Sequence, residues 1–213
     1  FKELSDVVGA DSMGWRYDPI FIDKKHSVEW HISEFEKMAE ILAGYTKTCV
    51  ISFIDIYKKV ERNFPEAMEV SHNDKITIGK AFIEIASRYG MTIKPCAEGN
   101  ELATYGADCS GCMTVDTFEK ALHNRLEIPK GKVNQRNGAC VCVLGVDIGA
   151  YDTCGHLCKY CYANADKALV RANMKKHNPE SPFLIGESMP GDVIHEAIQK
   201  SWIDRQLRFD YFY

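Results

Sequence analysis

Apolar residues follow two alternating patterns along the chain, one typical of buried strands and the other of amphipathic helices. Extended apolar runs, rich in β-branched and aromatic residues, cover residues 13–22, 49–57 (CVISFIDIY), 91–96 and 141–150 (VCVLGVDIGA). Each run is short enough for a strand and is bounded by glycine, proline or polar residues. The pattern therefore predicts four strands.

Helical periodicity fills the first two intervals between these runs. One helix is expected to begin after Ser27 and end at Gly44, and the next to begin at Asn73 or Asp74 and end at Gly90. Both carry apolar residues at helical spacing, so each should pack one face against the strands. These inward-facing residues are Val28, Ile32, Phe35, Met38, Leu42, Ile78, Phe82, Ile85 and Tyr89.

Three further helices are expected in the second half of the chain. Thr114 is a capping residue for a helix that reaches about Arg125, and two more helices are expected over about 165–176 and 192–207. Helices that alternate with strands predict parallel βα units. We therefore expect a single α/β domain over residues 1–213.

Polar residues interrupt the predicted strands near their carboxyl ends. They are Arg16 and Asp18 on the first strand, Asp55 on the second, and Glu98 just after the third. Sites in barrels and open α/β sheets gather at that edge. These four residues are our catalytic candidates, although Arg16 and Asp18 could equally form a structural ion pair.

Composition narrows the class of protein. The chain is 46% hydrophobic and 26% charged, with a formal net charge of −4, as in an ordinary globular domain. The charge gives no bulk attraction to nucleic acid, although a local basic patch would still provide one. Because no apolar run is long enough to span a bilayer, no membrane partner is expected.

The 9 cysteines are an odd number, which argues against a framework of disulfides. Most of them lie between Cys96 and Cys161, and this clustering favours metal ligation. We therefore expect a reducing, cytoplasmic compartment.

The densest cysteine group is Cys154, Cys158 and Cys161, within a loop at 151–164. Three thiolates spaced C-x3-C-x2-C can hold three irons of a [4Fe–4S] cluster and leave the fourth iron open. An open iron can chelate the amino and carboxylate groups of S-adenosylmethionine, and an electron from the cluster can then cleave the carbon–sulfur bond. The alternative is a structural zinc site completed by His156 or another cysteine, but zinc modules favour paired C-x2-C units.

This motif, with an aromatic residue before its last cysteine, resembles the cluster motif of the radical S-adenosylmethionine superfamily. The resemblance implies that Tyr160 lies against the adenine and that Gly186 and Glu187 match the segment that binds the methionine amino group. It also implies a TIM-barrel-like fold. Superfamily members usually carry this loop after the first barrel strand, whereas here it lies in the last third of the chain. A partial or permuted barrel would reconcile the two.

The whole chain also resembles domain-of-unknown-function family 1848, a prokaryotic family. The matching segments are WRYDPI, CVISFIDIYKK, CAE, VDIGAYDTCGHLCKYCYAN and KHNPESPFLIGE. Members of that family are longer at the N-terminus. We therefore expect this chain to be the C-terminal part of a longer barrel.

A second metal site is predicted from Cys96, Cys112, Cys140 and Cys142, which would suit either zinc or a second Fe–S cluster. The alternative is that they are small buried residues, which is the expectation for Cys49. Cys109 is too close in sequence to Cys112 to be dismissed. Histidines other than His156 are expected on surfaces.

The leading hypothesis is an Fe–S protein that acts as a radical S-adenosylmethionine enzyme on an unknown substrate, with ferredoxin or flavodoxin as electron donor. Residues 16–19 are also similar to a barrel strand of spore photoproduct lyase, which would imply nucleic-acid chemistry, but no basic, aromatic-interleaved groove is visible. The alternatives are a non-catalytic Fe–S electron carrier or redox sensor, and a zinc-stabilised binding module.

Overall fold

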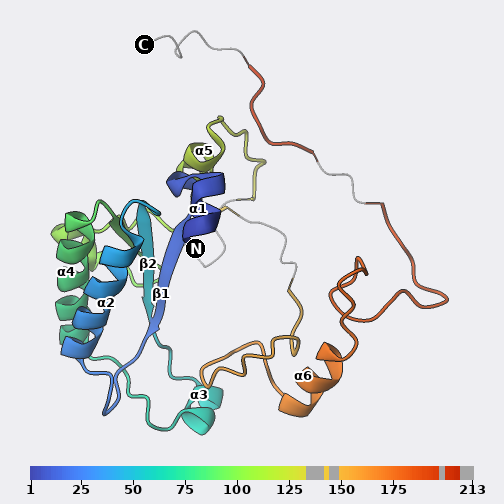
Figure 1. The fold of residues 1–213 in the computed structure, drawn as a ribbon, viewed down its shortest axis with the longest axis horizontal. Helices are drawn as coiled ribbons and strands as arrows, with labels where there is room; N and C mark the ends of the chain where they lie inside the picture. The colour runs from blue at the N-terminus through green and yellow to red at the C-terminus, as the bar shows by residue number, and fades with distance from the viewer. Residues whose placement is uncertain (133–141, 144–148, 197–199, 207–213) are drawn as a thin grey trace. The chain divides into compact units, whose positions relative to one another are not determined.

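The computed structural model describes residues 1–132, 142–143, 149–196 and 200–206 (Figure 1). Its contacts divide the chain into two compact units. The first, which we call the sheet unit, takes its described residues from Phe1–Ile54, Met68–Gly145 and Ser201–Tyr213. The second, the cysteine-loop unit, comprises the described parts of Asp55–Ala67 and Val146–Lys200. The prediction of a single domain stays a prediction.

The sheet unit contains three strands and most of the helices. Its elements are α1 (Lys2–Val8), the 3-10 turn η1 (Ala10–Ser12), β1 (Gly14–Ile20), α2 (Val28–Leu42), β2 (Thr48–Phe53), α4 (His72–Arg88), β3 (Thr92–Pro95), the 3-10 turn η2 (Glu101–Tyr105) and α5 (Val115–Leu122). The cysteine-loop unit contains α3 (Lys58–Asn63) and α6 (Lys167–Met174).

The three strands form a parallel sheet in the order β1-β2-β3, so the α/β class is confirmed. Arg16 pairs with Val50, which in turn pairs with Lys94, and these three residues share one face of the sheet. Helices α2 and α4 pack against each other and lie on the opposite face (Figure 1). The sheet therefore has one face covered by helices and one face that carries polar side chains.

Aromatic rings fill the space between the sheet and these two helices. Trp15 stacks on Phe35 with ring centroids 4.8 Å apart, and Phe35 stacks on Phe82 at 3.8 Å. The ring of Tyr17 meets Phe82 edge-on at 5.2 Å. Such pairs add to the hydrophobic stabilisation of a buried core. The pattern predicted Phe35 and Phe82 as core residues, and both are fully buried.

The buried residues of helix α2 differ from those predicted. It buries His31, Phe35 and Ala39, whereas Met38 is 43% exposed. His31 is buried because both ring nitrogens have partners: Nδ1 lies 2.9 Å from the Tyr17 hydroxyl and Nε2 lies 2.7 Å from the Phe21 carbonyl. The prediction that this histidine lies on a surface is wrong.

Capping residues define the helix starts. The hydroxyl groups of Ser27 and Thr114 accept the expected backbone hydrogen bonds. Helix α4 begins earlier than predicted, because Ser71 is its cap and accepts a hydrogen bond from the Asp74 amide. Helix α5 ends at Leu122, because the next residue takes a left-handed conformation.

The C-terminal part of the chain differs most from the sequence-based expectation. The described residues of 192–207 form no helix, and the strand predicted over 141–150 lies mostly outside the described residues. The predicted strand 49–57 ends at Phe53, and helix α3 follows it. Within the described residues, no helix combines the length and apolar character needed to cross a membrane.

Candidate functional site

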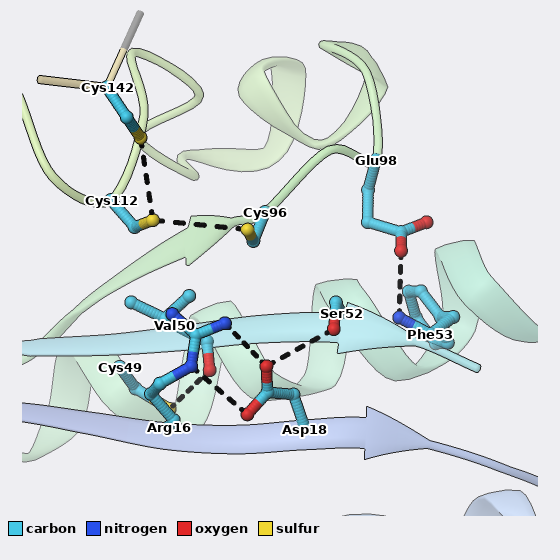
Figure 2. Close-up of polar contacts among 10 residues, drawn as sticks. All are labelled: Arg16, Asp18, Cys49, Val50, Ser52, Phe53, Cys96, Glu98, Cys112 and Cys142. Atoms are coloured by element: carbon cyan, nitrogen blue, oxygen red, sulfur yellow. Dashed lines mark hydrogen bonds and ion pairs between the residues drawn. The ribbon is translucent and has the colours of Figure 1, made fainter. Parts of the chain in front are cut away.

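The polar face of the sheet places two of the four catalytic candidates together. Arg16 and Asp18 lie within β1 rather than beyond its end, and their charged groups are 2.6 Å apart (Figure 2). Ser52, on β2, donates a hydrogen bond to the same carboxylate at 3.3 Å. Burial alone would lower the pKa of Arg16, but the Asp18 carboxylate and the Cys96 sulfur outweigh it, and the pKa is raised. Arg16 therefore stays positively charged, with the Asp18 carboxylate and the Cys96 sulfur as its neighbours.

Among the described residues, the other two candidates make no hydrogen bond or ion pair with this pair, and only Glu98 belongs to the same unit. Glu98 accepts a hydrogen bond from the Phe53 amide at 2.8 Å (Figure 2). It also pairs with Lys75 at 3.1 Å. These contacts tie the loop after β3 to the end of β2, so Glu98 has a structural role here. Asp55 is exposed and belongs to the cysteine-loop unit. The expectation that all four share one face of the molecule stays a prediction.

A group of sulfur atoms lies at the carboxyl end of β3. The Cys112 sulfur is 3.9 Å from the Cys96 sulfur and 3.7 Å from the Cys142 sulfur (Figure 2). The Met113 amide donates a hydrogen bond to the Cys142 sulfur at 3.4 Å. Three of the four residues predicted for a second metal site thus come together, while Cys140 lies outside the described residues.

The neighbouring sulfur atoms and burial favour the protonated form of the Cys112 thiol. Hydrogen bonding to Cys96, followed by burial, raises the pKa of the Cys112 thiol. Among the described residues, no three His, Cys, Asp or Glu side chains already enclose a position for a metal ion. Cys109, which the sequence left unassigned, lines the same small cavity as Cys96, Cys112 and Cys142.

A buried lysine holds the loop that carries Cys109 and Cys112. The Lys94 side chain is only 7% exposed, and its ammonium lies 2.7 Å from the Asp108 carboxylate. It also donates a hydrogen bond to the Gly111 carbonyl at 3.2 Å. Burial would raise the pKa of Asp108, but the Lys94 ammonium and hydrogen bonds from Ser110 lower it to about 2. Lys94, Asp108, Arg16 and Cys112 all line a second cavity of about 520 Å³.

Within the cysteine-loop unit, hydrogen bonds close the predicted cluster loop. The Asp152 amide donates to the Ala163 carbonyl at 3.1 Å, and the Asp152 carboxylate accepts from the amides of Ala165 and Asp166. The Asn164 side-chain amide donates to the Cys154 carbonyl at 2.7 Å. The ends of the loop are therefore fixed side by side, and the three cysteines lie between them.

Helix α3 and the residue before it provide further support for the same loop. The Tyr57 hydroxyl donates to the Tyr160 carbonyl at 2.9 Å, and the Lys59 ammonium donates to the Asn164 carbonyl. Burial, followed by the nearby Cys161 sulfur, raises the pKa of Tyr57. This support was missed in the sequence, because residues 49–57 were predicted to form one strand and α3 was not predicted.

The predicted ligands differ in their exposure. Cys154 and Cys158 are exposed, and Cys161 is half-buried. Gly186 and Glu187, the residues expected to bind the methionine amino group, belong to the same unit. The Gly186 amide donates to the Lys176 carbonyl at 3.1 Å, and Glu187 is exposed.

The fold and these cysteine groups describe an α/β protein with two sets of potential metal ligands. A family model described as a domain of unknown function (DUF1848) matches residues 1–163. The chain belongs to this family, as the sequence resemblance indicated. The matched region includes all nine cysteines. No curated protein and no solved structure matches the chain.

Proposed function

We propose that the chain binds a [4Fe–4S] cluster through Cys154, Cys158 and Cys161 and acts as a radical S-adenosylmethionine-type enzyme. The observation that carries the proposal is the closed loop between Asp152 and Asn164. Its ends are joined by hydrogen bonds and its three cysteines retain access to solvent. A loop of this kind keeps three thiols close together in the chain and accessible to a metal centre.

The donor set fits such a cluster. Three thiolates are one fewer than a closed four-cysteine site needs, which suits a cluster with one iron left for another ligand. When bound, the cluster supplies the electron for reductive cleavage of S-adenosylmethionine. In this arrangement the cysteines bind iron, Asp152 and Asn164 fix the loop, and Tyr160 would lie against the adenine, as the superfamily resemblance implies.

The sheet supports the finer proposal of a partial or permuted barrel. Its strands are adjacent in chain order, and α2 and α4 cover the same face (Figure 1). Consecutive right-handed βα units of a barrel have this arrangement, whereas a doubly wound sheet reverses its strand order and has helices on both faces. In a barrel, the face that carries Arg16, Asp18 and Lys94 would point inward. Arg16 and Asp18 are therefore the candidates for contact with the substrate.

Anaerobic reconstitution of the full chain tests the proposal. We expect about four irons and four sulfides per cluster, and loss of the visible absorption in C154S, C158S and C161S variants. The matched control is C49S, because Cys49 is fully buried in β2. The reduced protein, given S-adenosylmethionine and an electron donor such as reduced flavodoxin, should release 5′-deoxyadenosine and methionine.

Each negative result has a distinct meaning. A reducible cluster that leaves S-adenosylmethionine intact would contradict the enzyme proposal and indicate an electron carrier or redox sensor. Zinc in place of iron at these three cysteines would indicate a zinc-stabilised binding module. A normal cluster in all three serine variants would overturn the ligand assignment.

A further inference from the structure

The sulfur atoms at the end of β3 form a separate group from the proposed cluster ligands. We propose that Cys96, Cys109, Cys112 and Cys142 bind one tetrahedral metal ion of the zinc type. The four side chains line one small cavity in the sheet unit. This site does not depend on the cluster proposed at Cys154, Cys158 and Cys161, which belong to the other unit.

The spacing of the sulfur atoms favours a single ion over a cluster. Two thiolates bound to one tetrahedral zinc at Zn–S bonds near 2.3 Å are separated by about 3.7 Å. The Cys112 sulfur lies 3.7 Å from one neighbour and 3.9 Å from the other (Figure 2). Thiolates around a cubane bind different irons and lie several ångströms further apart. The observed distances therefore match one shared metal ion.

Cys109 is the fourth ligand in this proposal. It forms a C-x2-C pair with Cys112, in the segment Cys-Ser-Gly-Cys, which is the ligand spacing typical of structural zinc sites. Gly111 within that pair has φ 119°, a backbone conformation that a residue with a side chain rarely adopts. The turn thus keeps both cysteines of the pair in the wall of the same cavity.

The surrounding contacts hold the ligands in place from outside. Lys94 binds Asp108 on one side of the Cys109–Cys112 pair and the Gly111 carbonyl within it. The Met113 amide donates to the Cys142 sulfur, and the Val143 amide donates to the Met113 carbonyl at 2.7 Å. Hydrogen bonds of this kind to a thiolate are usual in the second shell of metal sites.

Binding requires the four cysteine side chains to converge on one position. The described side chains do not yet enclose a common metal position, although two of the sulfur–sulfur distances already suit one. Four protein ligands leave no vacant coordination position. The ion would therefore have a structural role, joining the loop after β3 and the segment at Cys142 to the sheet.

The experiment uses the full chain with C154S, C158S and C161S combined, so that the proposed cluster site is absent. We expect this triple variant to retain about one zinc and no iron or sulfide. Titration with Co(II) should give the intense visible bands of a tetrahedral thiolate site. Adding C96S, C109S, C112S or C142S should weaken zinc binding by at least about 100-fold, more than a second-shell change does. Adding C49S or C140S should leave it unchanged.

Three results would overturn the proposal. The first is a triple variant that contains no zinc and gives octahedral Co(II) spectra. The second is an iron–sulfur cluster in the triple variant. The third is an unchanged zinc affinity when C109S is added to it. If a serine variant fails to fold, X-ray absorption at the zinc edge of the triple variant decides the ligand number. Four sulfurs at about 2.3 Å support the site, and three or fewer contradict it.

Discussion

The ammonium group of Lys94 lies 2.7 Å from the carboxylate of Asp108, and the two partners differ sharply in exposure. The Lys94 side chain is 7% exposed, whereas that of Asp108 is 37% exposed. Removing either partner should therefore have unequal consequences, because only the lysine would be left as a buried charge.

The first prediction follows from this asymmetry. Asp108→Asn should lower the free energy of unfolding by about 1–3 kcal/mol, because a buried ammonium loses its charged acceptor. Lys94→Met should cost less, because its apolar chain fills the same space and Asp108 can be hydrated. The double variant should resemble Lys94→Met. Urea unfolding of the four proteins measures these differences, and additive single-variant costs would contradict the coupling.

The same pair predicts a dependence of stability on acid pH. The pKa of Asp108 is lowered from 3.8 to about 2 by Lys94 and by hydrogen bonds from Ser110, despite the opposing effect of burial. A carboxyl with a lowered pKa stabilises the fold fully above its ordinary pKa, and that contribution is lost as the pH falls through about 2–4. Asp108→Asn should therefore show a smaller loss of stability over this range than the wild-type protein.

His31 provides a second pH dependence, near neutrality. Burial lowers the pKa of His31 below 6.5, and protonation would replace the acceptor nitrogen needed by the Tyr17 hydroxyl. The neighbouring His26 lowers it further, while the Phe21 carbonyl and Asp23 oppose the shift. Because the folded state favours neutral His31, the contribution of this residue to stability is complete above pH 6.5. That contribution is lost as the pH falls from 6.5 through the lower pKa of the folded state.

We therefore expect the urea midpoint of the wild-type protein to decrease below pH 6.5, with a flatter profile in His31→Gln. The matched control is His72→Gln, because the His72 side chain is 67% exposed. An unchanged slope in His31→Gln would show that another group causes the pH dependence.

The sequence predicted the parallel βα units and the aromatic core because these depend on local periodicity. Phe35 and Phe82 follow the helical spacing, and their burial needs no long-range information. The burial of His31 depends on Tyr17 and Phe21, which lie on other elements. The spacing of apolar residues along the chain gives no information about these hydrogen bonds, so His31 was predicted to lie on the surface.

For the cysteines, too, the sequence predicted one part of the site and missed another. The predicted second metal site placed Cys96 at the end of one strand, Cys112 on the loop after it, and Cys140 and Cys142 at the start of the next predicted strand. The sulfurs of Cys96, Cys112 and Cys142 do come together. The C-x2-C spacing of Cys109 and Cys112 was a signal for the fourth cysteine that the sequence-based site did not use. The role of Lys94 could not be predicted, because a lysine in a strand is usually exposed.

Gly79 offers a test of packing between α4 and η2. A Cβ at this position would lie 2.5 Å from one Leu102 methyl carbon and 2.7 Å from the other. Leu102 is itself buried, so it has little room to move. Gly79→Ala should therefore destabilise the protein by about 1–3 kcal/mol from overpacking, despite the helix propensity of alanine.

The double variant Gly79→Ala/Leu102→Ala separates packing from backbone effects. Since the smaller side chain removes the clash, the glycine substitution should cost little in that background. Thermal unfolding of the two single variants and the double variant measures the coupling. Equal effects of Gly79→Ala in both backgrounds would contradict contact with Leu102 as the cause.

The closure of the cysteine loop can be tested at Asp152. This residue is 9% exposed, has φ 56°, and its carboxylate accepts hydrogen bonds from two backbone amides. Its carbonyl also accepts from the Asn173 side chain at 3.0 Å. Asp152→Ala would leave the two amides without this acceptor and place alanine in a left-handed conformation.

We expect Asp152→Ala to lower the iron content after reconstitution and to destabilise the unit by about 2–4 kcal/mol, from lost hydrogen bonds and backbone strain. Asp152→Asn should be milder, because asparagine retains an acceptor oxygen and tolerates this conformation. Asp192→Ala is the matched control, since that exposed carboxylate accepts a hydrogen bond from the single amide of Met189. Iron analysis and thermal unfolding measure both effects. If Asp152→Ala binds iron as the wild type does, cluster binding cannot depend on the closed loop, and the observation that carries the proposed function loses its force.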